Sequence, residues 1–564
     1  MRASTLRFAF AALASAQILL SCAPCKAQTV NTTNTITRPT RDQVVDRAIE
    51  REHALAEMLK TRTPLIETYL QELKFDSKVG PVPDKDYYFL GRVDLTDTVD
   101  RLDYLPKGSF KSRLLGGFSR LYRLEYKPLG FTWMMFVDRD GFNRSTYDFS
   151  YVHREFLGDV RCLVFEVTPK QSKENGRFRG RIWVEDQNYN IVRFNGIYGP
   201  GKRNSYFFHM DSWRLNLTPG YWLPSYIYSE EGDLGPGSKQ QQEQLAFKAQ
   251  TRLWAYNLHK GDSEGEFTDV VVDSTVKDAS PAAQDPSPLQ AEHLWMQQAA
   301  DNVIERLQNG GLLAPAGELD KVLSTVVSNL LVTNNLELEL PVHVRVMLTS
   351  PLESFSVGNT IVVSRGLLDV LPDEASLAAV LAHELSHILL GHNIGSKYAF
   401  SDRMLFSDES VYRNLGFRRT SGEEEEADKK AMDLLKSSPY SQKLDTAGLF
   451  LRELARHGPA LSALCTPHLG NGFTDGKGSV TRMVALMNSS PALDEQKLDQ
   501  TAALPLGGRV RLNAWDDRVE LVKTKPAVIT SARDKMPLAV TPFFPHLTRQ
   551  DSNSDPTATA RTNN

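Results

Sequence analysis

The chain has 564 residues, of which 41% are hydrophobic and 24% are charged, and its formal net charge is −4. A chain of this length exceeds one ordinary hydrophobic core, so two or three domains are expected. The small net charge gives no reason to expect nucleic acid or an anionic membrane surface as a partner.

The first 27 residues are typical of an export signal. Arg2 and Arg7 give a positively charged start, and the apolar run from Phe8 to Leu20 is too short to cross a bilayer comfortably. We therefore expect residues 1–27 to be a signal peptide and the protein to be exported. It would lie in the periplasm or be anchored to the outer membrane of a bacterial envelope.

Two cleavage sites remain open. Residues 19–22, Leu-Leu-Ser-Cys, resemble a lipobox, in which Cys22 would carry a lipid and tether the protein to a membrane without spanning it. Residues 25–27, Cys-Lys-Ala, resemble an ordinary small-residue site that would release a free protein. No later stretch has the ~18 continuous apolar residues that a membrane-spanning helix needs.

Residues 28–83 are expected to form an N-terminal helical segment. Between residues 41 and 74, apolar residues recur at helical spacing among charged ones. Pro64 is expected to kink or split this segment, because proline cannot donate the helical hydrogen bond.

Residues 84–278 are expected to form an antiparallel β-sheet. Aromatic and β-branched residues alternate there with polar ones, and Gly, Asn and Asp punctuate them. No long helical stripe interrupts the strands, so a curved or half-closed sheet is expected. The clearest predicted strands are 162–167, 177–185, 190–198, 205–210, 226–229 and 245–255.

A Pro/Ala/Ser-rich linker at 279–290 separates this sheet from a mainly helical region at 291–500. Residues 501–564 are a C-terminal extension, in which disorder is expected from about residue 545, where apolar residues become rare. The expected fold is multidomain α+β, with the sheet first and the helical domain second. Helices are predicted at 291–307, 317–333 and 371–392, and strands at 342–349 and 360–364.

Residues 381–392, LAHELSHILLGH, carry the strongest chemical signal. His383 and His387 are four residues apart, so on a helix their imidazoles share one face and can hold one metal ion. Glu384 can then reach a metal-bound water and act as general base. Apolar flanking residues predict that this helix is buried, which raises the electrostatic effect of the metal charge.

A catalytic zinc ion needs three protein ligands and one open position. His392 lies about 140° around the helix from His387, so it is poorly placed to face the same ion. The longer pattern HExxHxxGxxH would need a histidine at position 393, where this chain has Asn393. That subclass is therefore excluded, and the third ligand must come from elsewhere.

The acidic run at 423–428 offers a third ligand on another predicted helix. Its plain interpretation is a first turn that complements the helix dipole. Glu424 and Asp428, however, share the apolar face of that helix, so both carboxylates would be buried and would need partners. Zinc for Glu424 and the N–H of a ligand imidazole for Asp428 would supply them.

The two motifs, His-Glu-Leu-Ser-His at 383–387 and Glu-Glu-Glu-Ala-Asp at 424–428, resemble the HExxH and ExxAD pair of one gluzincin family. That family holds the CAAX prenyl proteases, HtpX and the periplasmic protease BepA, and the likeness covers roughly residues 290 to 440. The resemblance implies a zincin domain with one Zn²⁺ per chain. It implies His383, His387 and Glu424 as metal ligands and Asp428 as the partner of a ligand.

The chain departs from this family further downstream. Residues 465–469, Cys-Thr-Pro-His-Leu, match a Thr-His-Pro stretch of the family imperfectly. The resemblance to BepA implies that His468 is a fourth, inhibitory zinc ligand, and the alternative is a surface loop histidine. Substrate is expected to add as an extended strand beside residues 360–364.

The β-rich region loosely resembles the half-barrel of LolA and RseB, which hold an acyl chain or a peptide on a concave apolar face. Trp183, Trp213 and Trp222 would suit such a cup, and they would equally suit an ordinary core. A lipid or lipoprotein is therefore a candidate partner of this region.

These patterns predict a zinc metalloendopeptidase that acts on envelope or secreted proteins, in protein quality control. Its partners would be protein or peptide substrates, without nucleic acid. Two other functions remain open: a lipid or lipoprotein carrier with an auxiliary peptidase domain, and a scaffold whose zinc site is permanently capped. The intact Glu384 argues against the scaffold, which has no need of a general base.

Overall fold

The chain is described by a computed structural model. No helix among the described residues is long and apolar enough to cross a membrane. The predicted export signal and Cys22 lie outside the described residues. The structure describes residues 39–76, 80–96, 99–104, 128–171, 176–199, 208–231, 247–256, 288–338, 340–392, 417–466, 469, 472–475, 479–494, 500–507, 509–513, 518–521 and 538–550.

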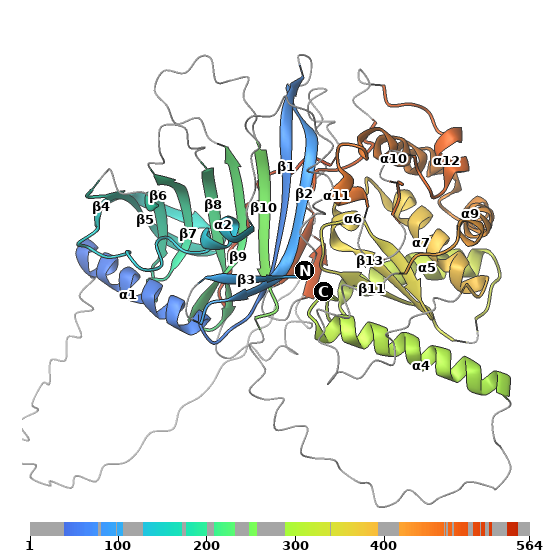
Figure 1. Ribbon diagram of the computed structural model, residues 1–564, viewed down its shortest axis with the longest axis horizontal. Coiled ribbons are helices and arrows are strands. Elements are labelled where there is room, and N and C mark those ends of the chain that lie inside the picture. Colours follow the sequence, from blue (N-terminus) through green and yellow to red (C-terminus); the bar gives the residue numbers. More distant parts are fainter. Residues whose placement is uncertain are drawn as a thin grey trace, which may run out of the picture.

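The N-terminal domain is one ten-stranded sheet, on the left of Figure 1. Its strand order is β3-β2-β1-β10-β9-β8-β7-β6-β5-β4, and the antiparallel sheet predicted from the sequence is confirmed. The strands are β1 (Leu65–Asp76), β2 (Gly80–Asp94), β3 (Asp100–Asp103), β4 (Tyr147–Leu157), β5 (Val160–Pro169), β6 (Arg177–Glu185), β7 (Ile191–Gly199), β8 (Phe208–Thr218), β9 (Tyr221–Glu231) and β10 (Phe247–Trp254).

The helix predicted to continue to residue 74 is wrong beyond Leu59, where α1 (Arg41–Leu59) ends. The chain passes Pro64 and enters β1, so the sheet begins about twenty residues earlier than the predicted boundary at 84. β1 is buried on both faces, and its polar residues Glu67 and Gln71 are buried as well. It therefore lacks the alternation that identifies a half-exposed strand.

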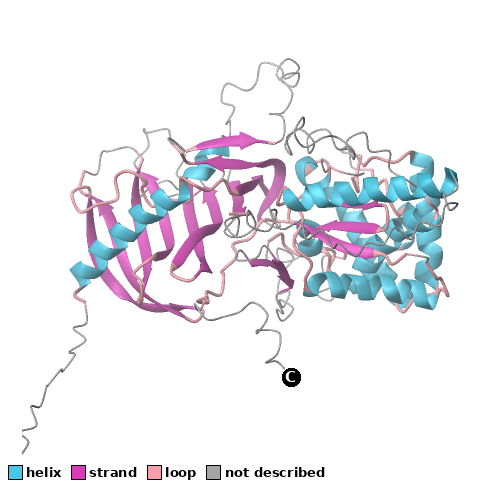
Figure 2. Ribbon diagram, turned by 90° about the horizontal axis from the view of Figure 1, so that it is seen from below, coloured by secondary structure: helices cyan, strands magenta, loops and turns pink. Residues whose placement is uncertain are grey.

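The two faces of the sheet bury different cores. α1 crosses one face, as Figure 2 shows, and packs there together with the short helix α2 (Pro128–Trp133). A buried ion pair fixes α1, since Arg214 of β8 donates to Glu52 at 2.6 Å. Trp183, Trp213 and Trp222 belong to the core on the other face, because neighbouring side chains of a strand alternate between faces. They are thus core residues outside the face that α1 covers.

The C-terminal domain is mainly helical and lies on the right of Figure 1. α4 begins inside the linker that the sequence predicted at 279–290. The helices are α4 (Pro288–Asn309), α5 (Glu318–Thr333), α6 (Arg365–Val370), α7 (Glu374–Leu389), α9 (Ser421–Lys436), α10 (Leu444–His457), α11 (Ser462–Cys465) and α12 (Val484–Ser489), with a 3-10 turn η3 (Ser441–Lys443).

A three-stranded sheet completes this domain, with the order β11 (His343–Met347), β13 (Thr360–Ser364) and β12 (Ser354–Val357). β13 is the central strand, parallel to β11 and antiparallel to β12. The expectation that substrate adds beside residues 360–364 is therefore wrong, because both edges of β13 are already paired. β12 is the edge strand beside α7, as the bond from Ser354 Oγ to Glu384 at 2.8 Å indicates.

The two domains meet in a buried polar interface on β1 and β2. Arg365 Nη2, fully buried in the C-terminal domain, donates to Glu67 of β1 at 2.7 Å. Asp86 of β2 accepts the N–H groups of Ala463 and Leu464 at the start of α11, each at 2.8 Å. The apolar core is continuous across the same junction. The sheet therefore supports the residues that lead into the 466–483 segment.

The last described residues return to the N-terminal domain after the hairpin β14 (Val510–Asn513) and β15 (Arg518–Leu521). Val540 N–H donates to Gln71 on β1 at 2.8 Å, and Gln550 N–H donates to Asn216 on β8 at 2.6 Å. Leu547 is fully buried between them. The prediction of disorder from about residue 545 is therefore wrong for residues 545–550, because the isolated apolar side chain of Leu547 anchors this polar stretch of chain.

Candidate metal and catalytic site

Helix α7 carries both motif histidines. Asp373 caps its start, with the side chain accepting from Ser376 N–H at 2.8 Å. His383 and His387 project from one side of the helix because they are four residues apart. Each is only 1% exposed, so the imidazoles lie in the core of the domain rather than on its surface.

The acidic residues in the first turns of helix α9 have different partners. Thr420 and Glu423 form a capping box at its start. Glu425 is exposed and pairs with Lys429 at 2.9 Å. Glu424, in contrast, is buried and faces α7. The helix therefore turns Glu424 inward, at the position that the spacing indicated.

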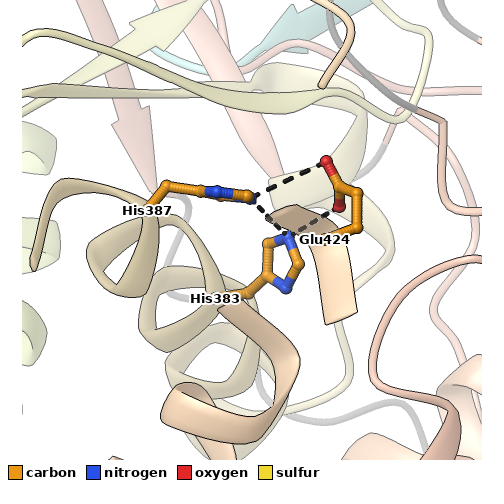
Figure 3. Close-up of side chains that lie close together, drawn as sticks. All are labelled: His383, His387 and Glu424. Carbon is orange, nitrogen blue, oxygen red and sulfur yellow. Dashed lines mark hydrogen bonds and ion pairs between the residues drawn. The ribbon is translucent and has the colours of Figure 1, made fainter. Parts of the chain in front are cut away.

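The two helices bring three donor atoms together, and Figure 3 shows their side chains pointing toward one another. His383 Nε2 lies 3.1 Å from both His387 Nε2 and Glu424 Oε2, and His387 Nε2 lies 3.7 Å from Glu424 Oε1. Donors that hold one zinc ion at ~2.0–2.2 Å in a tetrahedral arrangement lie about 3.4 Å apart. Two imidazoles and one carboxylate at this spacing fit Zn²⁺.

The outer ring nitrogens of the two histidines have partners as well. Asp428 Oδ1 lies 2.8 Å from His383 Nδ1, and its other oxygen accepts Met483 N–H at 2.7 Å. A carboxylate on Nδ1 leaves Nε2 free for a metal. His392 Nδ1 lies 2.9 Å from His387 Nδ1, on the side away from the donor group. His392 is thus not a third ligand, in agreement with its angle on the helix.

Glu384 lies beside the donor group in a buried polar cage. Ser354 Oγ donates to it at 2.8 Å, Ser356 Oγ at 3.2 Å and Arg482 Nη1 at 2.9 Å. Burial by itself raises the pKa of Glu384, but Arg482 and then the two motif histidines outweigh burial, so the pKa lies below its usual range. The carboxyl group is therefore ionised at neutral pH, as a general base must be.

The pKa values of the two motif histidines are shifted in opposite directions. Burial lowers the pKa of His387 to about 3. Burial also acts to lower the pKa of His383, but its hydrogen bonds to Asp428 and Glu424 bring it above the usual value. Burial tends to raise the pKa of Glu424, yet His383 and Arg482 hold it well below its ordinary range. The donor group therefore offers an ionised carboxylate and a neutral imidazole.

Arg482 is the functional side chain that the sequence patterns did not indicate. It is 3% exposed and reaches Ser354 and Glu384, and its Nε lies 3.7 Å from Glu424. The next residue, Met483, has a φ of 52°, which is uncommon for a residue other than glycine. A lone arginine in a loop rich in Gly, Ser and Thr has no periodicity that could have identified it.

Of the residues singled out in the sequence, the structure brings together His383, Glu384, His387, Glu424 and Asp428. His468 lies outside the described residues, so its role as a capping ligand stays a prediction.

Two solved structures resemble part of the chain. A DUF1329 family protein from Desulfovibrio piger is 16% identical, covers 38% of this chain and 94% of its own, and gives a TM-score of 0.18. An outer membrane lipoprotein-sorting protein domain from Vibrio parahaemolyticus is 12% identical, covers 40% of this chain and 98% of its own, and gives a TM-score of 0.16. At such low TM-scores neither likeness bears on what the N-terminal domain does. No curated protein matches the chain.

The family comparison falls on the region that carries the site. Residues 318–456 match the model of peptidase family M48, and this span runs from α5 through α7 and α9 to α10. It includes the three donor residues as well as Glu384 and Asp428. Over residues 318–456 the C-terminal domain is therefore similar to the peptidases of family M48, and the three residues that could hold a metal ion lie within this span.

Proposed function

We propose that the protein is a zinc-dependent endopeptidase that hydrolyses peptide bonds of envelope or secreted proteins. The observation that carries this proposal is the convergence of His383, His387 and Glu424 beside an ionised Glu384. The first three residues would hold the ion. When bound, it would supply a Lewis acid for the scissile carbonyl and lower the pKa of a water molecule.

The residues of the chain perform the remaining steps. Glu384 takes a proton from the attacking water and delivers it to the leaving amine nitrogen. Ser354, Ser356 and Arg482 hold this carboxylate in place from the side of β12. Asp428 fixes the orientation of His383. Because these groups are buried, the charges act on one another with little screening by water.

A groove beside the donor group supports cleavage within an extended chain rather than only at its end. It occupies about 2160 Å³, part of it open to solvent, and follows α9 from Glu424 past Asp428 and Met432 to Lys436. The twelve residue steps from Glu424 to Lys436 extend about 18 Å, which accommodates roughly five residues of an extended peptide. Thr474 and Met483 belong to the lining contributed by the 472–485 region.

The cellular setting is part of the proposal. Export to the envelope, with or without a lipid on Cys22, is supported by the charged start and apolar run of residues 1–27. Protein quality control is the role that suits an exported endopeptidase with an open groove. Lipid or lipoprotein binding by the N-terminal domain stays a prediction, since none of the contacts described above favours it over a structural sheet.

Cleavage of unfolded casein by purified protein tests the proposal. We expect hydrolysis at internal peptide bonds that phenanthroline abolishes and that equimolar zinc restores. Release of single residues from chain ends would reject the endopeptidase, and hydrolysis that survives complete removal of metal would reject zinc chemistry.

A further inference from the structure

β12 is the strand edge closest to the catalytic residues. Residues along a strand alternate in the direction of their main-chain groups. Ser364 N–H donates to the Glu353 carbonyl at 2.9 Å, so Glu353 faces β13. The main-chain groups of Ser354 and Ser356 therefore point outward, where an added strand would pair.

Arginine side chains donate hydrogen bonds to both of these outward-facing carbonyl oxygens. Arg482 Nη2 donates to the Ser354 carbonyl at 3.1 Å. Arg419 Nη2 donates to the Ser356 carbonyl at 2.9 Å and lies 3.0 Å from the hydroxyl of the same residue. A peptide that adds to β12 needs these acceptors for its own N–H groups, so the edge is closed in this structure.

The segment before α9 holds Arg419 in this position. Phe417 is 2% exposed and stacks on Phe355 of β12, with ring centroids 4.6 Å apart and an angle of 19° between the planes. Arg419 also donates from Nη1 to the carbonyl of His392, beyond the end of α7. The segment thus ties the edge strand, the histidine helix and the start of α9 together.

The two arginines differ in what their release would cost. Arg482 also binds the Glu384 carboxylate, so moving it would disturb the general base. The hydrogen bonds of Arg419 go to Ser356 and to a main-chain carbonyl. An incoming strand can replace the bond to the Ser356 carbonyl with its own N–H group at little net cost.

We propose that Arg419 is a gate residue, which occupies the substrate edge of β12 in a closed state and is displaced when a peptide strand binds. This inference rests on the proposed peptidase function, because the strand that displaces Arg419 is the substrate. It predicts that the closed state reduces affinity for every peptide that pairs with β12, whatever its side chains.

Binding of a peptide hydroxamate to the zinc-loaded protein tests the gate without requiring turnover. Arg419→Met keeps the aliphatic stem and removes every donor. Arg456→Met is the control, because this arginine of α10 is 60% exposed and does not line the groove. Loss of the hydrogen bonds that Arg419 makes in the closed state should tighten hydroxamate binding on the order of 10-fold in Arg419→Met. Arg456→Met should bind as the wild type does.

If Arg419→Met retains one zinc per chain and binds the hydroxamate no more tightly than the wild type, the proposed gate is overturned. Absence of hydroxamate binding in the wild type and in both variants overturns it as well. A crystal structure of the wild type with the hydroxamate keeps the proposal testable if Arg419→Met loses its fold. Arg419 displaced from the Ser356 carbonyl supports the gate, and Arg419 still bound there overturns it. Tighter binding in Arg419→Met without hydrolysis by the wild type would retain the gate and reject the proposed endopeptidase.

Discussion

Replacement of Arg482 by methionine should shift the acidic limb of the pH–activity profile. Arg482 Nη1 lies 2.9 Å from Glu384, and the two side chains are 4% and 1% exposed. An opposite charge this close lowers a carboxyl pKa by about 1–3 units. Without it, burial raises the pKa of Glu384 while the two motif histidines and Arg419 remain to oppose it. The base works ionised, so activity would be lost at a higher pH than in the wild type.

The magnitude follows from this shift. The acidic limb of kcat/KM should move up by about 1–3 units, so that activity is half its plateau at the new midpoint, about 10-fold below the plateau one pH unit lower, and recovers at higher pH. Arg482→Lys keeps the charge and should give a smaller shift. The assay is peptide hydrolysis across pH 5–9, with zinc content measured at each pH and Arg456→Met, at an exposed position outside the groove, as a charge control. An unmoved acidic limb in a zinc-loaded Arg482→Met protein would refute this account of Glu384.

Three other predictions concern the metal and the domain junction. Glu424→Gln should lose stoichiometric zinc while Glu425→Gln keeps it, as metal analysis of both would establish; the opposite result would show that the register of α9 is misassigned. Burial raises the pKa of Asp86 to about 6, so the folded protein binds this proton more tightly than the unfolded chain does. Its contribution to stability should therefore fall by about 3 kcal/mol as pH rises from about 4 to 6. A melting-temperature series should show a flatter dependence in Asp86→Asn than in the wild type or in the exposed control Asp84→Asn, and parallel curves would contradict it. Glu67→Ala removes the closer of the two carboxylates that pair with the buried Arg365 and leaves it only Asp369 at 3.5 Å, so it should destabilise the protein by about 3 kcal/mol in denaturant unfolding, whereas a change below 1 kcal/mol would mean that the junction contributes little.

The elements with strong local patterns were predictable. The strands at 177–185 and 360–364 have the bounds that alternation indicated, and the histidine helix agrees within three residues at each end. Glu424 could be distinguished from Glu425 because four-residue spacing places it on the apolar face of α9. These predictions depend on residues close in sequence, which a single chain reveals.

The predictions that were wrong, and the site residue that was missed, depend on contacts between segments that are far apart in the sequence. The segment that forms β1 was predicted to continue α1, because its buried polar residues break the alternation expected of a strand. These residues are paired in the structure with groups of the other domain, as Glu67 is with Arg365. Arg482 becomes part of the site only when the loop after α11 folds back onto α7, and no local pattern records that. The substrate edge was placed on β13 because the sequence does not reveal which strands pair on either side of it.

The most direct test of the catalytic assignment compares the wild type with Glu384→Gln for zinc content and casein hydrolysis in the same preparations. The account predicts one zinc per chain in both proteins and a turnover about 10²–10⁴-fold lower in the variant, because the ligands remain and only the general base is lost. Near-normal hydrolysis by zinc-loaded Glu384→Gln, or a wild type that binds no zinc, would contradict it.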